Sequence, residues 1–302
     1  MNQDPTSHRL QSPSGEICWF EWGQRGEGPT LLLLHATGFH ARVWDQVVAY
    51  LPDNFHVVAV DQLGHGRSHK PATMADWTAN CRALLPLVDH LTSEAGGAPL
   101  VGCGHSMGGY VLALLAAERQ QAFRHILVID PVILDPAHYT GADHIVPDPA
   151  DHPVSKRRNR WESAEQMRAH FSQRKPYATW QNEVLADYCQ YGLLPAEDGD
   201  GYVLACPPLL EASMYQNAPR NSPYAAADQI RSDVTVIRAK MGQRNGEMDF
   251  SSSPTWPQAA AHLNHGRDVY WPEYSHFIPM EAPKKVADML QAIAASAVSA
   301  AS

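Results

Sequence analysis

Hydrophobic residues follow two patterns along the first half of the chain, and the two patterns alternate. Unbroken apolar runs of four or five residues are typical of strands buried on both faces of a sheet. Such runs occur at residues 30–34 (TLLLL), 56–60 (HVVAV), 100–103 (LVGC) and 125–129 (HILVI). Apolar residues at helical spacing lie between them, at residues 42–51, 74–91 and 109–118. Strands that alternate with helices in this way predict an α/β fold with a mostly parallel sheet.

The pattern changes in the middle of the chain, where Pro, Asp, Arg and aromatic residues become frequent. Helical spacing continues there, but without apolar runs of comparable quality, at residues 162–171 and 182–191. Strand patterns return at residues 234–238 (VTVIR) and 268–271, and an amphipathic helix is expected at residues 281–294. We therefore predict one α/β core, residues 1–135 and 229–302, interrupted by a largely helical insertion, residues 136–228.

Composition and charge narrow the classes of partner. The chain has 23 Lys and Arg against 32 Asp and Glu, a formal net charge of -9, which argues against nucleic-acid binding because phosphate affinity comes from clustered cations. A short basic run at residues 156–160 (KRRNR) is expected to be solvated. The start of the chain lacks signal-peptide features, and no apolar run is long enough to span a bilayer. We expect a cytoplasmic monomer or homodimer without nucleic-acid or membrane partners.

Cysteine and histidine spacing gives no sign of a metal site. The five cysteines are irregularly spaced and contain no Cys-x-x-Cys pair, so we interpret them as free, mostly buried thiols. None of the 16 histidines occurs in a His-Glu-x-x-His pattern. No metal ion is expected to take part in the chemistry.

The strongest chemical signal is a Gly-x-Ser-x-Gly motif at residues 104–108 (GHSMG), which follows an apolar run and precedes a helical pattern. A serine on such a strand-to-helix turn has a strained backbone, and the flanking glycines avoid clashes there. The helix that begins behind it favours a developing negative charge. The sequence therefore predicts Ser106 as a nucleophile.

A serine nucleophile needs a general base and donors for the oxyanion. His276 follows the last strand pattern, and the order of serine first and histidine last matches that of α/β-hydrolases, so we predict His276 as the base. The oxyanion donors are expected to be the backbone N–H groups of Met107, which follows the nucleophile, and of Thr37, in the loop after the first apolar run. His35 and His105 are expected to pack or hydrogen-bond around the site.

Five segments, taken together and in this order, resemble the α/β-hydrolase superfamily, specifically its lidded esterase- and lactonase-like branch: LLLLHATGFHARVW, VVAVDQLGHGRS, VGCGHSMGGY, ILVIDPVILDP and YSHFIPMEAP. The resemblance implies an eight-stranded, mostly parallel sheet flanked by helices. It also implies a helical cap inserted after the sixth strand, and no cofactor. It does not imply a substrate, because one fold serves many reactions.

The chain departs from the commonest family pattern at the third catalytic residue. Most relatives carry an acid in the turn after strand seven, where this chain has Gly242. A minority carry the acid at the end of strand six, which is the position of Asp130. A longer loop could instead bring Glu247 or Asp249 to His276. We favour Asp130, because a strand end is a more rigid mount than a Gly-flanked loop, and leave the alternatives open.

The insertion supplies aromatic side chains for a substrate pocket, because ligand sites are lined mainly by apolar groups. The expected pocket residues are Trp180, Tyr188, Tyr191, Met214 and Phe277. We predict a serine hydrolase that cleaves a carboxylic ester or lactone of a hydrophobic or aromatic small molecule through an acyl-enzyme on Ser106. The alternatives are carbon-carbon bond hydrolysis, acyl transfer or perhydrolysis by the same residues, and a small-molecule receptor of this fold.

Overall fold

The structure of the protein is a computed structural model that describes residues 1, 4–26, 28–74, 76–94, 98–139, 148–217, 222–242 and 251–299. Its central element is an eight-stranded sheet with the strand order β1-β2-β4-β3-β5-β6-β10-β11. The strands are β1 (Thr6–Ser12), β2 (Gly15–Trp22), β3 (Thr30–Leu34), β4 (His56–Asp61), β5 (Leu100–His105), β6 (Phe123–Ile129), β10 (Asp233–Arg238) and β11 (Gly266–Tyr270). From β4 to β11 all neighbours are parallel, so the predicted α/β fold is confirmed.

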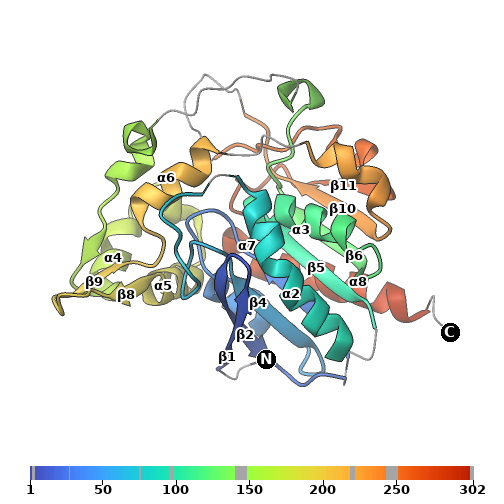
Figure 1. Cartoon of the computed structure of the whole chain (residues 1–302), viewed down its shortest axis with the longest axis horizontal. Helices are drawn as coiled ribbons and strands as arrows, with labels where there is room; N and C mark the ends of the chain where they lie inside the picture. Colours follow the sequence, from blue (N-terminus) through green and yellow to red (C-terminus); the bar gives the residue numbers. More distant parts are fainter. Residues whose placement is uncertain are drawn as a thin grey trace.

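Helices cover both faces of the sheet, and a separate hydrophobic cluster fills each side. Figure 1 shows α2 and α3 in front of the sheet and α8 behind it. The core helices are α1 (Asp45–Ala49), α2 (Thr78–Glu94), α3 (Met107–Glu118), α7 (Ile278–Glu281) and α8 (Pro283–Ser299), with the 3-10 helices η1 (Ala41–Trp44) and η7 (Ala259–His262). Strands β4 and β5 are buried along their whole length, which explains their unbroken apolar runs.

The chain between β6 and β10 contains three α-helices and a small second sheet. The helices are α4 (Ala164–Phe171), α5 (Asn182–Tyr191) and α6 (Pro208–Gln216), and the 3-10 helices are η2 (Pro136–Tyr139), η3 (Pro149–Asp151), η4 (Pro153–Lys156), η5 (Tyr177–Thr179) and η6 (Pro223–Gln229). The antiparallel sheet consists of β7 (Arg160–Trp161), β9 (Tyr202–Leu204) and β8 (Leu193–Pro195). Much of this part lies to the left of the core in Figure 1. The division at residues 136 and 228 stays a prediction.

Several elements carry too little apolar pattern to be predicted. Strands β7, β8 and β9 are only two or three residues long. Strand β1 is polar and has no buried residue, and it pairs with β2 as an antiparallel hairpin at the edge of the sheet. The helix expected at residues 281–294 is preceded by the short helix α7 and runs on to Ser299.

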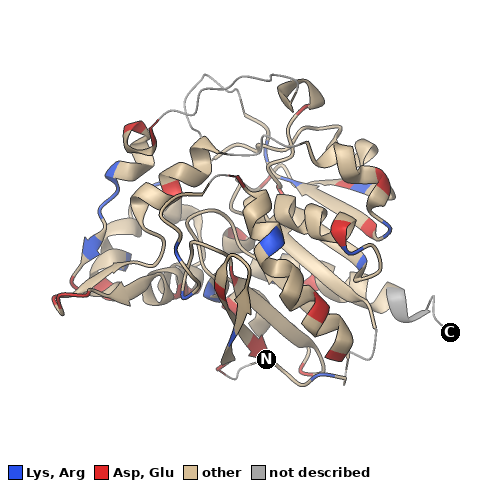
Figure 2. Cartoon of the chain, in the orientation of Figure 1, with Lys and Arg blue, Asp and Glu red and all other residues tan. Residues whose placement is uncertain are grey.

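Basic and acidic residues are mixed over the fold. In the view of Figure 2, the ribbon positions of Lys and Arg lie among those of Asp and Glu over the described residues. None of the described helices combines the length and the apolar character needed to cross a bilayer.

Candidate active site

Ser106 lies on the tight turn between β5 and α3. Its backbone has φ 55° and ψ -117°, a strained conformation for a residue with a side chain. The flanking glycines are required sterically. A Cβ added to Gly104 would lie 2.4 Å from the Gly108 carbonyl oxygen, and a Cβ added to Gly108 would lie 2.3 Å from the Leu34 carbonyl oxygen. The turn therefore holds the serine hydroxyl at the carboxyl end of the central strand.

His276 and Asp130 form a line of hydrogen bonds with this serine. The Ser106 hydroxyl lies 3.0 Å from His276 Nε2, and His276 Nδ1 lies 2.6 Å from Asp130 Oδ2. Ser106 and His276 are each 6% exposed, and Asp130 is fully buried. The neutral imidazole can accept the serine proton at Nε2 while its Nδ1–H donates to the carboxylate. Two of the predicted site residues thus meet, together with the favoured acid.

The carboxylate of Asp130 is itself held by three donors on its other oxygen. Asp130 Oδ1 accepts from the Ala239 N–H at 2.9 Å, from the Ser253 hydroxyl, and from the Thr255 hydroxyl at 3.2 Å. Ser253 and Thr255 follow β10 and were not anticipated, because nothing in their local sequence distinguishes them from other loop residues. The alternative acids Glu247 and Asp249 lie outside the described residues.

The neighbouring His105 contacts the His276 loop and not the serine. The His105 Nε2–H donates to the His276 carbonyl oxygen at 2.8 Å. Burial lowers the pKa of His105 well below its usual value, so the ring is neutral. His105 therefore anchors the backbone of His276.

The loop after β3, residues 35–38, which we call the β3 loop, lies beside the first turn of α3. Thr37 Oγ1 lies 3.3 Å from Met107 Sδ. The Gly38 N–H donates to His65 Nε2 at 3.0 Å, and burial lowers the pKa of His65 to about 3, which keeps that nitrogen an acceptor. Among the described residues, the backbone N–H groups of Thr37 and Met107 have no hydrogen-bond acceptor. Such free donors can bind an anion.

The side chain of His35 holds the β3 loop in place by two hydrogen bonds. The His35 Nδ1–H donates to the Ala36 carbonyl oxygen at 2.7 Å, and Nε2 accepts from the Gln62 N–H at 3.0 Å. One ring nitrogen thus bonds within the loop and the other bonds to the residue after β4, and burial lowers the pKa of His35 well below its usual value.

Three of the five expected pocket residues gather next to His276. The rings of Trp180 and Phe277 are 5.3 Å apart, and those of Trp180 and Tyr188 are 5.4 Å apart. Phe39, which was not predicted, packs within 6.1 Å of Phe277 and 5.2 Å of Tyr188. An aromatic wall therefore extends from the core to α5.

The structure does not place Tyr191 and Met214 with this aromatic group. The Tyr191 ring lies 3.8 Å below the guanidinium of Arg42, and the Tyr191 carbonyl accepts from Arg67. Met214 is fully buried in the other hydrophobic cluster, where its carbonyl accepts from Trp77 Nε1 at 2.9 Å. The assignment of these two residues to the substrate pocket stays a prediction, because helical spacing does not reveal which neighbour each face of a helix meets.

The described residues do not offer a metal site: no three His, Cys, Asp or Glu side chains among them converge as ligands.

Comparison with known proteins places this geometry in context. The family model described as "Alpha/beta hydrolase family" matches residues 31–289. The lipase LipV of Mycobacterium tuberculosis is 28% identical over 251 residues, which cover 77% of this chain and 89% of that protein. Two solved structures have similar folds. E-2-(acetamidomethylene)succinate hydrolase has a TM-score of 0.72 at 19% identity, with 95% of this chain and 97% of that one covered. The enol-lactonase from Burkholderia xenovorans LB400 has a TM-score of 0.65 at 18% identity, with 94% and 98% covered.

Proposed function

Because this chain belongs to the alpha/beta hydrolase family, we propose that it is a serine hydrolase that cleaves a carboxylic ester or lactone of a hydrophobic or aromatic small molecule. The observation that carries the proposal is the continuous line of hydrogen bonds from Asp130 through His276 to Ser106. A serine hydroxyl becomes nucleophilic when an adjacent base removes its proton. The 3.0 Å separation of Ser106 Oγ and His276 Nε2 is within reach for that transfer.

In the first half of the proposed reaction, Ser106 Oγ attacks the carbonyl carbon while its proton moves to His276 Nε2. Asp130 keeps the imidazole in the required tautomer and stabilises the imidazolium that forms. The N–H groups of Thr37 and Met107 donate to the oxyanion, and the start of α3 adds a favourable potential. His276 then gives its proton to the alkoxide, which leaves as an alcohol, and the acyl group remains on Ser106.

In the second half, water attacks the acyl-enzyme while His276 Nε2 takes one of its protons. The tetrahedral intermediate is held by the same two N–H groups. Its collapse returns the proton to Ser106 Oγ and releases the carboxylic acid. With a lactone, the alcohol and the acid are two ends of one product.

The hydrophobic part of the substrate is inferred from the wall of Phe39, Trp180, Tyr188 and Phe277, which lies next to His276. Aromatic and apolar walls bind apolar groups by removing them from water. The name of the relative LipV, a lipase, supports a carboxylic ester with an apolar part.

Ser106→Ala tests the proposal. Turnover of p-nitrophenyl butyrate is expected to fall by about 10⁴-fold or more, because the nucleophile and its proton relay act as one unit. The melting temperature is expected to change little. Ser232→Ala is the matched control, since Ser232 is buried and its hydroxyl has no partner among the described residues. Undiminished turnover in Ser106→Ala would exclude this mechanism.

A further inference from the structure

Three side chains between β6 and β10 form a chain of polar contacts that ends on the β3 loop. Arg157 follows η4, Tyr188 belongs to α5 and Glu211 to α6. Arg157 Nη1 lies 2.5 Å from Glu211 Oε2, and Arg157 Nη2 donates to the Tyr188 hydroxyl at 3.1 Å. The basic run at residues 156–160 is therefore not wholly solvated as expected, because Arg157 faces inward.

The carboxylate of Glu211 packs directly against Gly38 in the β3 loop. A Cβ added to Gly38 would lie 2.3 Å from Glu211 Oε1, so the carboxylate fills the space that a side chain would need. Gly38 also has φ 80°, in the left-handed region that favours glycine. Because Gly38 directly follows Thr37, Glu211 restrains the peptide next to a proposed oxyanion donor.

Glu211 carries a charge that needs compensation. It is 3% exposed, and burial raises its pKa while the positive charge of Arg157 opposes that rise. Burial also raises the pKa of four described groups that interact electrostatically with Glu211, so these stay neutral near pH 7: Tyr177, Tyr188, Tyr215 and Cys206. Within the described part of the chain, Arg157 is the cation that pairs with this carboxylate.

We propose that Arg157 is a positioning residue for the proposed reaction: it neutralises Glu211, so that this carboxylate holds the β3 loop without placing a net negative charge beside the oxyanion. The inference rests on the proposed function, since the oxyanion forms only when Ser106 attacks a carbonyl. A carboxylate paired with a cation has only a weak, dipolar effect on a nearby oxyanion. An unpaired carboxylate repels the oxyanion and raises the free energy of the transition state. Arg157 acts through Glu211 and does not itself touch the reacting atoms.

The test measures kcat for p-nitrophenyl butyrate from pH 6 to 9 in Arg157→Met, Glu211→Gln and the double variant. Without Arg157 only burial acts on the pKa of Glu211, so its carboxyl is protonated at low pH and ionises as the pH rises. Arg157→Met is therefore expected to match wild type near pH 6 and to lose about tenfold in kcat by pH 9, with KM little changed. The double variant lacks the ionising group and is expected to recover to within about threefold of wild type.

Two further variants separate charge from packing. Arg160→Met is the matched control, because Arg160 lies in the same basic run but is half-exposed and pairs with Asp198; its pH profile is expected to match wild type. Glu211→Gln keeps the side-chain shape and removes the ionising carboxyl, so its kcat is expected to show no additional loss relative to wild type as the pH rises from 6 to 9. If Arg157→Met does not fold, Arg157→Gln is the second variant, because it removes the same charge and keeps a polar group beside Glu211 and Tyr188; the same loss of kcat at high pH is expected.

A pH-independent loss in Arg157→Met that the double variant does not recover would overturn the inference, and so would a large loss in Glu211→Gln alone. Failure of the proposed function has a different signature. The wild-type chain would then hydrolyse no ester and would not be labelled at Ser106 by a fluorophosphonate, which reacts with activated serines.

Discussion

At the scale of single residues, the precision of the proposed active site depends on how Asp130 is held. Its backbone has φ 42°, uncommon for a residue with a side chain, and its N–H donates to the Ile237 carbonyl at 2.7 Å. One carboxylate oxygen faces His276, while the other accepts from Ala239, Ser253 and Thr255. The loop after β10 here supplies hydroxyl donors to an acid that directly follows β6.

Substitutions at these positions should differ in size of effect. Asp130→Asn is expected to lower kcat for the test ester by about 10³- to 10⁴-fold, because the amide no longer selects the productive tautomer of His276. Ser253→Ala removes one donor to the carboxylate and is expected to lower kcat by about tenfold. Steady-state kinetics of the purified variants measure both effects.

The control for this pair of variants is Glu247→Gln, which is expected to retain wild-type kcat. If Glu247→Gln lost activity and Asp130→Asn kept it, the acid would have been assigned to the wrong residue. Ser232→Ala again controls for the loss of a buried hydroxyl.

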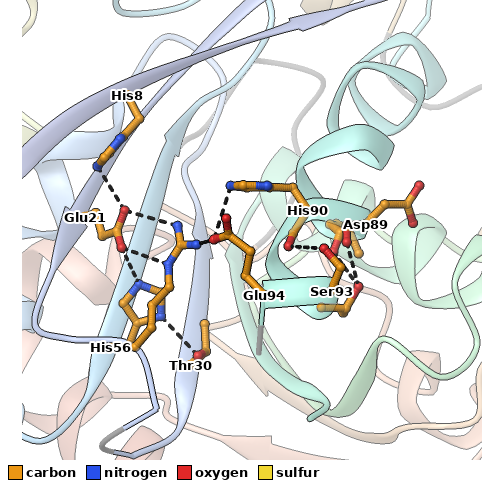
Figure 3. Close-up of polar contacts among 11 residues, drawn as sticks. His8, Glu21, Thr30, His56, Asp89, His90, Ser93 and Glu94 are labelled. Carbon is orange, nitrogen blue, oxygen red and sulfur yellow. Dashed lines mark hydrogen bonds and ion pairs between the residues drawn. The ribbon is translucent and has the colours of Figure 1, made fainter. Parts of the chain in front are cut away.

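At the scale of elements, the β1-β2 hairpin is joined to the core by a cluster of ion pairs at the amino ends of the parallel strands. Figure 3 shows Glu21 of β2 between His8 of β1 and His56 of β4. The Glu21 carboxylate lies 2.9 Å from both His8 Nε2 and His56 Nε2, and 3.0 Å from Arg25 Nε. Arg25 also contacts Glu94 at the end of α2. One carboxylate thus joins two strands and, through Arg25, a helix.

This cluster should make stability depend on pH. The hydrogen bond from His56 and, beyond it, Arg25 lower the pKa of Glu21 from 4.5 to about 2, against the opposing effect of burial. Because the pKa is lower in the folded chain, Glu21 stabilises the fold above its ordinary pKa, and this contribution disappears as the pH falls toward 2. Glu21→Gln is therefore expected to lower the free energy of unfolding by about 2 kcal/mol at pH 7, allowing for solvent screening, and by less than half of that near pH 3.

Urea denaturation of wild type and Glu21→Gln at the two pH values measures this difference. Glu16→Gln serves as the control, since Glu16 lies on the same strand but pairs with Arg9 at a more exposed position. A Glu21→Gln effect that is equally large at pH 3 would show that packing, and not charge, accounts for it.

At the scale of the whole molecule, the burial of the cysteine thiols shows which parts of the fold exclude solvent. All five cysteines are free and buried. Cys18 and Cys103 lie in the cluster on one side of the sheet, Cys81 lies in the other, and Cys189 lies in α5. Burial raises the pKa of Cys18 to about 11 and of Cys81 and Cys189 to about 12. Each region of the fold thus contains a thiol that is both shielded and protonated.

Alkylation should therefore follow unfolding. The five thiols of the native protein are expected to react with iodoacetamide at pH 8 at least about 100-fold more slowly than in 6 M guanidinium chloride, because only the thiolate is reactive. Mass spectrometry of timed samples counts the modified cysteines. Rapid native labelling of Cys189 alone would instead show that α5 opens independently of the core.

The sequence by itself determined the fold class and the two residues at the centre of the proposed chemistry. Buried parallel strands need continuous apolar runs, and a nucleophile turn needs glycines at fixed positions relative to the serine. Both requirements therefore produce local patterns that are visible in the sequence. The α/β-hydrolase fold, expected from the resemblance, is confirmed by the family match and by the structure. The side chains of Ser106 and His276, predicted from motif and chain order, lie 3.0 Å apart.

Only the tertiary structure decided which side chains meet across the fold. Asp130 and His276 are 146 positions apart, and the sequence left Glu247 and Asp249 open beside Asp130. Periodicity in the sequence does not reveal the donors Ser253 and Thr255 or the contact between Arg157 and Glu211. It also does not reveal the positions of Tyr191 and Met214. Their partners depend on the relative placement of elements that are distant along the chain, and local spacing contains no information about that placement.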